Sequence, residues 1–213
     1  MNGVRRAVCL VACLALAQPA AAQGLSVPPA DSNQHPIADV VTFLAGGALG
    51  LALHETGHVL FDAAFDAHPT LESVHFGPIQ FFAITHENNL PWREEYAIDS
   101  AGFWMQEATS EWLLTSRPNL RATKAPFAKG LLAFNVLASV GYAAVAFTKS
   151  GPGERDTRGM AAALGVDERA VGVLVLTPAV FDAIRYFKPD AAWARWASRI
   201  AKVAGVVVIF KER

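Results

Sequence analysis

The feature that most constrains this chain is its long uncharged segments. No Asp, Glu, Lys or Arg occurs from residue 40 to residue 54, and none occurs from residue 130 to residue 147, between Lys129 and Lys149. Each segment, with its neighbouring residues, approaches the ~20 apolar residues that a helix needs to cross a bilayer. Three glycines in the first segment, at positions 46, 47 and 50, would let neighbouring helices approach closely. We therefore predict a mainly α-helical protein built as a membrane helix bundle.

Composition supports this prediction and narrows the function. The chain has 213 residues, which suits one domain, and 53% of them are hydrophobic. A mean hydropathy of +0.28 is high for a soluble domain. The net charge of −1 gives no electrostatic basis for binding nucleic acid, so we expect none as a partner. Membrane lipid is the expected surrounding.

The N-terminus has the features of a secretory signal. A short basic region precedes the apolar run "AVCLVACLALA", and Ala20 and Ala22 are small residues suited to cleavage. We predict a signal peptide over residues 1–22, a linker over 23–37 and one membrane-embedded domain over 38–213. Both cysteines, Cys9 and Cys13, lie in the signal, so the mature chain would lack thiolate ligands. A lipoprotein signal and an uncleaved anchor are the alternatives.

The rest of the chain alternates between β-type and helical patterns. Residues 70–89 are rich in β-formers around Gly77-Pro78 and predict a small β-hairpin or one bent strand after the first helix. A mixed polar and apolar helix is expected over residues 94–114, and a loop over 149–159. Asp167 is expected to cap a helix over 168–187 that contains Pro178. The amphipathic C-terminal segment is typical of a helix at the membrane interface.

A candidate metal site lies at the end of the first apolar segment, in "HETGH". His54 and His58 are four residues apart, so they share one helix face and can bind one ion. Glu55 points to one side, where it can act on a metal-bound water without being a ligand. This His-Glu-x-x-His pattern on a helix is typical of zinc metallopeptidases, in which the glutamate is the general base.

A catalytic zinc ion needs a third protein ligand and one open position. No other histidine lies in a helical context, so we expect a carboxylate. Glu107 and Glu111, one turn apart, are one source. Asp182 is the other, and we favour it, because an unpaired carboxylate in "LVLTPAVFDAIRYF" would be costly. The competing interpretation of Asp182 is a salt bridge, to Arg185 or to a basic loop.

At this point the sequence resembles the site-2 protease family of intramembrane zinc metalloproteases, over roughly residues 38–187. "HETGH" matches the family's first motif. "SAGFWMQ" resembles its Ala-Gly-Pro element, with Phe103 in place of proline. "LTPAVFDAIRYF" resembles its aspartate motif, with Ala183 in place of glycine.

The resemblance implies zinc on His54, His58 and Asp182, with Glu55 as the catalytic base. It also implies that the strands around residues 76–84 hold an extended polypeptide substrate by edge pairing. The expected function is therefore a zinc metallopeptidase of the bacterial inner membrane, exported through its signal and cleaving membrane or membrane-adjacent polypeptides.

Two other functions stay open at this stage. The first is an exported zincin-type protease, largely soluble or peripheral, that uses Glu107 or Glu111 as third ligand. The second is a membrane scaffold or metal-binding protein without turnover. Replacement of Glu55 by Gln separates an enzyme from a scaffold, because only an enzyme would lose an activity.

Overall fold

A computed structural model describes residues 36–76, 78–86 and 90–210 of the chain. The predicted signal peptide, residues 1–22, and the predicted linker up to residue 35 lie outside the described residues. The first described helix begins at Pro36, so the last two residues of the predicted linker are helical.

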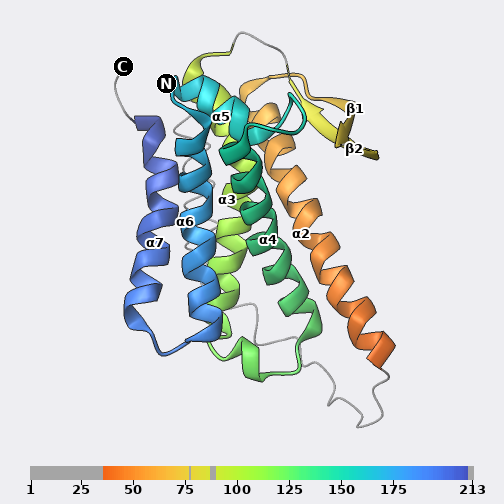
Figure 1. The fold of residues 1–213 in the computed structure, drawn as a ribbon, viewed down its shortest axis with the longest axis vertical. Helices are drawn as coiled ribbons and strands as arrows, with labels where there is room; N and C mark the ends of the chain where they lie inside the picture. The colour runs from red at the N-terminus through yellow and green to blue at the C-terminus, as the bar shows by residue number, and fades with distance from the viewer. Residues whose placement is uncertain (1–35, 77, 87–89, 211–213) are drawn as a thin grey trace.

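Six α-helices and one two-stranded sheet make up most of the described chain (Figure 1). In chain order, with η for a 3-10 helix, the elements are α2 (Pro36–Phe65), β1 (Thr70–Phe76), β2 (Ile79–Thr85), α3 (Trp92–Ser116), η1 (Leu120–Ala122), α4 (Pro126–Thr148), α5 (Asp156–Leu164), α6 (Glu168–Phe187), α7 (Ala192–Val207) and η2 (Val208–Phe210). The predicted fold class is confirmed: a mainly helical bundle with a small antiparallel sheet after its first helix.

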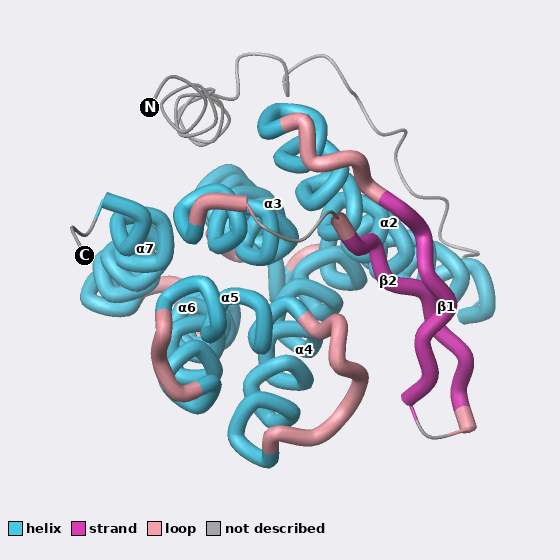
Figure 2. Tube along the Cα trace, turned by 90° about the horizontal axis from the view of Figure 1, so that it is seen from above, coloured by secondary structure: helices cyan, strands magenta, loops and turns pink. Residues whose placement is uncertain are grey.

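The five long helices run side by side, whereas α5 and the hairpin lie at one end of the bundle (Figure 1). Helix α3 contacts each of the other five helices and lies between α7 and α2 in the view from above (Figure 2). Its buried side chains include Tyr96, Ile98 and Leu113. Two of its polar residues have partners on other helices: Ser110 accepts a hydrogen bond from Asn135, and Glu111 pairs with Arg185.

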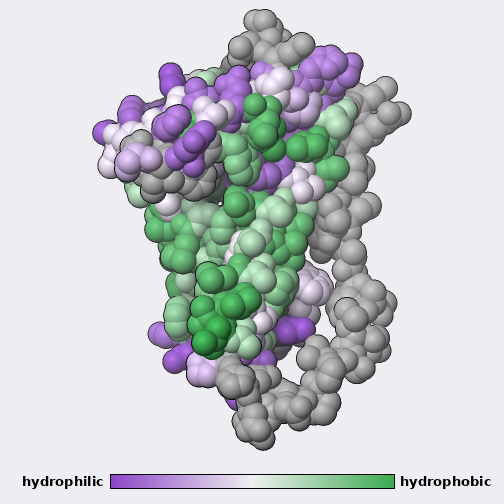
Figure 3. All heavy atoms as spheres, turned by 90° about the vertical axis from the view of Figure 1, so that its right-hand side faces the viewer, coloured by the Kyte–Doolittle hydropathy of each residue, from purple (hydrophilic) through white to green (hydrophobic). Residues whose placement is uncertain are grey.

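Three helices of the described chain, α2, α4 and α6, are long and apolar enough to cross a membrane. They expose large apolar side chains such as Leu44, Leu137 and Val173. Hydrophobic residues cover the middle of the molecule, and hydrophilic residues gather at its two ends (Figure 3). This distribution is compatible with membrane association.

Helices α2 and α4 approach each other closely through glycines. A methyl group on Gly46 would overlap the Phe127 carbonyl group, and one on Gly130 would overlap that of Phe43. The bare backbones therefore pack directly against each other, as small residues allow in membrane bundles. This contact sets the distance between the helix that carries the histidines and the helix that leads to α5.

The hairpin forms two short antiparallel strands rather than one bent strand. Thr70 lies opposite Thr85, and Phe76 lies opposite Ile79 across a two-residue connection. His86 follows β2 directly. Its ring contacts Asp62 of α2 and Glu95 of α3, at 3.6 Å and 3.2 Å. The hairpin is thereby tied to the bundle at the end nearest α5.

The last two helices form an antiparallel pair. Asp167 caps α6 as predicted, accepting a hydrogen bond of 2.9 Å from the Arg169 backbone NH group, and the helix continues through Pro178. Helix α7 lies alongside α6 and exposes Trp193 and Trp196. Ser198 and Lys202 of this helix are buried against the bundle, whereas Arg195 is exposed. The place at a membrane interface that its amphipathic pattern indicates stays a prediction.

Candidate metal centre

The two histidines of the motif meet as their spacing predicts. His54 and His58 lie one turn apart on α2, and their Nε2 atoms are 3.3 Å from each other. Both residues are buried, with 2% and 5% of their surface exposed. The helix therefore presents two ring nitrogens to one point inside the protein.

Asp156 supplies a third donor atom at this point. Its Oδ2 atom lies 3.1 Å from Nε2 of His54 and 3.6 Å from Nε2 of His58. The three donor atoms lie within 4.8 Å of one another, the only such group of three among the described residues. Two imidazoles and a carboxylate that converge in this way have the composition of a zinc site.

The surrounding residues fix the orientation of both rings. The Nδ1 atom of His58 is 2.9 Å from the Ile98 carbonyl oxygen, so an NH group at Nδ1 leaves Nε2 free to bind a metal ion. The His54 ring is stacked on Tyr142, with centroids 5.7 Å apart, and meets the edge of Phe103 at 5.5 Å. Both imidazoles are thus held in place before any ligand binds.

Gly102 leaves the space that the His54 ring occupies. A methyl group at this position of α3 would overlap three atoms of the imidazole. Gly102 belongs to the "SAGFWMQ" stretch that resembles the Ala-Gly-Pro element. The stretch lies inside α3 and packs against α2.

The carboxyl group of Asp156 is held in its ionised form. Burial alone would raise the pKa of this group, but the adjacent His58 and His54 rings outweigh it and hold the pKa below its usual range. The Tyr142 hydroxyl group also reaches this carboxylate. A divalent cation would be bound by this ionised carboxylate together with the two imidazoles in their neutral form.

Glu55 lies beside this group without joining it. It is half-buried and close enough to interact electrostatically with His54, His58 and Asp156. Its carboxylate does not belong to the three-residue group. This is the relation that the motif predicts for a general base, next to the metal ion but not bound to it.

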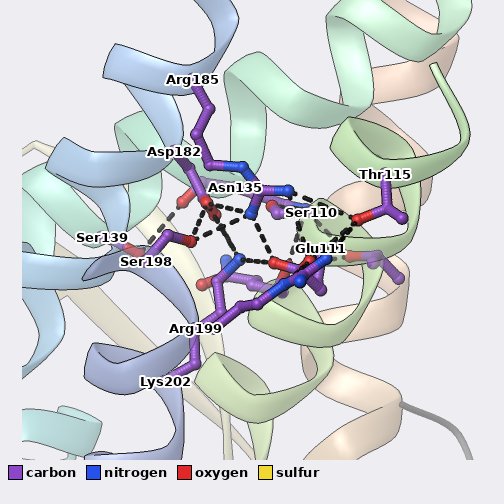
Figure 4. A network of polar contacts seen from close by, with 12 residues as sticks. Ser110, Glu111, Thr115, Asn135, Ser139, Asp182, Arg185, Ser198, Arg199 and Lys202 are labelled. Atoms are coloured by element: carbon purple, nitrogen blue, oxygen red, sulfur yellow. Dashed lines mark hydrogen bonds and ion pairs between the residues drawn. The ribbon is translucent and has the colours of Figure 1, made fainter. Parts of the chain in front are cut away.

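Asp182, the favoured third ligand, lies elsewhere, and this corrects the expectation. It accepts hydrogen bonds from Ser198 at 2.6 Å and Lys202 at 2.9 Å, and Arg185 lies 3.5 Å away (Figure 4). The salt bridge weighed as its alternative role is therefore present. Asp182 comes fourteen residues after the first residue of α6, about 21 Å along the helix axis at 1.5 Å per residue. That first residue, Glu168, contacts the two neighbours of Asp156, so Asp182 is far from the histidines.

Neither glutamate of the rival assignment joins the histidines. Glu111 binds Arg185, Arg199 and Lys202, and the last two contacts measure 2.9 Å and 3.2 Å (Figure 4). Glu107 lines a cavity of about 10 Å³ beside Asp182. Buried carboxylates need compensation, and here basic side chains of α6 and α7 provide it for Glu111 and Asp182.

Little in the local sequence favours Asp156 as a ligand. It follows the Gly- and Pro-containing stretch "SGPGER", and residues 149–159 were predicted to be a loop. In the structure Asp156 is the first residue of α5, a helix of only nine residues. The available signal was an aspartate directly before the helix-compatible run "TRGMAAAL", a pattern that also fits an ordinary helix start.

Comparison with known proteins adds no assignment. No family model matches the chain, and no curated protein or solved structure does. The function therefore has to be argued from the site itself.

Proposed function

We propose that this protein is a membrane-embedded zinc metallopeptidase of the site-2 protease type, with zinc on His54, His58 and Asp156. The observation that carries the proposal is the convergence of these three donor atoms within 4.8 Å, with Glu55 beside them. Two histidines and one carboxylate leave a fourth zinc position open, as catalytic zinc sites do.

The residues present fit this ion. The Nδ1 atom of His58 has a backbone carbonyl partner, which is the usual outer contact of a metal-bound histidine. The three donor atoms lie 3.1 to 3.6 Å from one another, and all three residues are largely buried. Zinc bound there would act as a Lewis acid and lower the pKa of a bound water molecule towards 7.

In this proposal the chain's own residues handle the proton. Glu55 accepts the proton of the attacking water and delivers it to the leaving amide nitrogen, the role of the glutamate in the His-Glu-x-x-His pattern. The Tyr142 and Phe103 rings cover one side of the site and limit the access of bulk water. The non-catalytic scaffold remains the rival, and the adjacent Glu55 favours an enzyme over it.

The proposed substrate is a membrane or membrane-adjacent polypeptide. Two of the three apolar helices, α2 and α4, carry residues of the site, and the two-stranded sheet offers strand edges with which an extended peptide could pair. The proposed location is the bacterial inner membrane, reached through an N-terminal export signal.

The experiment compares metal content and hydrolysis in purified protein. We expect about one zinc per chain in the wild type and in Glu55→Gln, and a strong loss in His54→Ala. Glu55→Gln should also lose cleavage of a fluorogenic apolar peptide in detergent micelles. Full zinc in His54→Ala would remove the metal assignment. Undiminished cleavage by Glu55→Gln would remove Glu55 as the base.

A further inference from the structure

The third ligand of the candidate metal centre stands on the shortest helix of the bundle, so something else must hold it in place. Asp156 begins α5, after a connection from α4 that includes Gly151 and Gly153. Such a connection cannot by itself fix the direction of one side chain to within the tolerance of a metal ligand. The surroundings of Asp156 therefore need an explanation.

The two residues that flank Asp156 bind the same carboxylate. Arg155 donates to Glu168 through Nε at 2.7 Å and through one terminal nitrogen at 2.6 Å, a two-point contact. The Thr157 hydroxyl group donates to Oε1 of Glu168 at 2.8 Å. Thr157 has none of its surface exposed and Glu168 has 7%. Glu168 is the first residue of α6, so this contact joins α6 to the start of α5.

This arrangement fixes the backbone on both sides of the ligand. Arg155 also donates to the Pro152 carbonyl oxygen at 2.7 Å, which anchors the connection before α5. With its two neighbours held by one buried group, Asp156 has little freedom except at its own side-chain torsions. Charge-assisted, two-point contacts of this kind are strong and geometrically specific.

A neighbouring ion pair provides a natural comparison. Asp167, one residue before Glu168, binds Lys149 at 2.7 Å and so also joins the start of α6 to the end of α4. Both partners are about half exposed, and neither flanks Asp156. If zinc affinity depended only on how the start of α6 is joined to its neighbouring helices, substitutions at Asp167 and at Glu168 would both lower it. If zinc affinity depends on the position of Asp156, only the substitution at Glu168 should lower it.

We propose that Glu168 is a positioning residue for the metal centre, holding Arg155 and Thr157 so that the carboxylate between them meets His54 and His58. The inference rests on the proposed function, because it requires Asp156 to be a metal ligand. Glu168 itself does not touch the metal. It makes the start of α6 part of the support of the site, although α6 contributes no ligand.

The test measures zinc affinity of the full-length protein in detergent by competition with a chromophoric chelator. Glu168→Gln keeps the shape of the side chain and removes its charge. We expect zinc affinity to fall by up to about 10-fold, the low end of the loss for an outer contact of a ligand, because Glu168 acts on Asp156 through Arg155 and Thr157. Asp167→Asn is the matched control. It removes the Lys149 ion pair, keeps a capping oxygen and should bind zinc as the wild type does.

A double-mutant cycle separates positioning from a general loss of structure. In an Asp156→Ala background the carboxylate to be positioned is gone, so adding Glu168→Gln should leave zinc affinity unchanged. If Glu168→Gln folds poorly, Thr157→Val tests the same point, because it removes one contact of Glu168 at constant volume. Its affinity should also fall, by less than that of Glu168→Gln.

Two results would overturn the inference: wild-type zinc affinity in Glu168→Gln, or an equal loss from Glu168→Gln with and without Asp156. Failure of the proposed function looks different. In that case the wild type binds no more zinc than His54→Ala does, and the Glu168 variants do not differ from it.

Discussion

At the residue scale, the candidate centre depends on which aspartate stands at the histidines. Asp156 lies within 3.1 Å and 3.6 Å of the two imidazoles, whereas Asp182 is neutralised by Lys202 and Arg185. Both are buried carboxylates on helices of the bundle, and both could be ligands by composition. Only their surroundings distinguish them, and those surroundings predict different consequences of mutation.

Replacing each aspartate by Asn should therefore separate metal binding from stability. Asp156→Asn should lose most of the bound zinc, because a neutral amide is a weaker ligand than a carboxylate. Asp182→Asn should keep about one zinc per chain but melt at a lower temperature, because it leaves Lys202 buried with less compensation. Metal analysis together with thermal melting checks this. Loss of zinc only in Asp182→Asn would restore the assignment made from the sequence.

Gly102 gives a second prediction at this scale. Gly102→Ala places a methyl group against the His54 ring, so the ring must move or α3 must shift. We expect weaker zinc binding and a loss of stability of about 1–3 kcal/mol, typical of overpacking. Gly141→Ala on α4 is the control, since its methyl group would meet open space. Equal zinc affinity in the two variants would show that the His54 ring can accommodate the added methyl group without moving away from its metal-binding position.

At the element scale, the hairpin is held by a histidine between carboxylates. The pKa of His86 is raised, mainly by its hydrogen bond to Glu95, against burial, which lowers it; the charges of Glu95, Asp99 and Asp62 raise it further. A raised pKa means that the charged ring stabilises the folded state. This contribution is complete below about pH 6.5, the unfolded value, and is lost as pH rises through the higher folded value.

The difference in melting temperature between wild type and His86→Gln should follow this contribution. We expect it to be largest below about pH 6.5, the ordinary pKa of histidine, and to shrink as the pH rises through the raised pKa of the folded state. His75→Gln, on the exposed face of β1, should melt in parallel with the wild type at every pH. A wild-type advantage over His86→Gln that stays constant with pH would assign the effect to packing.

Helix α4 is the most clearly defined candidate span. It runs from Pro126 to Thr148, and the uncharged stretch between Lys129 and Lys149 lies within it. A topology reporter fused before Lys129 and one fused after Lys149 should therefore report opposite sides of the membrane. Two reporters on the same side would show that α4 does not cross the bilayer.

At the scale of the whole molecule, the buried ionisable side chains gather in two places in a largely apolar bundle. The candidate centre forms where α2, α3 and α4 meet α5, at the hairpin end. The ionic network of Glu111, Asp182 and the basic residues of α6 and α7 forms farther along α6 (Figures 1 and 4). Buried ionisable groups are costly in such a setting, so each place needs its own compensation. In the ionic network, basic side chains compensate the buried carboxylates. In the candidate centre, we propose that a metal ion compensates the charge of Asp156.

The sequence by itself determined the features that depend on local spacing. Uncharged runs of membrane-spanning length gave the helical bundle, β-formers around Gly77-Pro78 gave the hairpin, and the four-residue spacing of His54 and His58 gave a shared helix face. Asp167 as a cap is of the same kind. In each case the information lies within a few consecutive residues, where backbone geometry relates sequence directly to position.

Only the tertiary structure decided which carboxylate meets the histidines. Asp156 lies 102 residues from His54 in sequence, and its place follows from how α4, α5 and α6 pack against α2 and α3. Local patterns carry no record of that packing. The buried carboxylate of Asp182 does need a partner, as the sequence indicates. Its partner is Lys202 of α7, which reaches Asp182 only because α7 packs against the bundle.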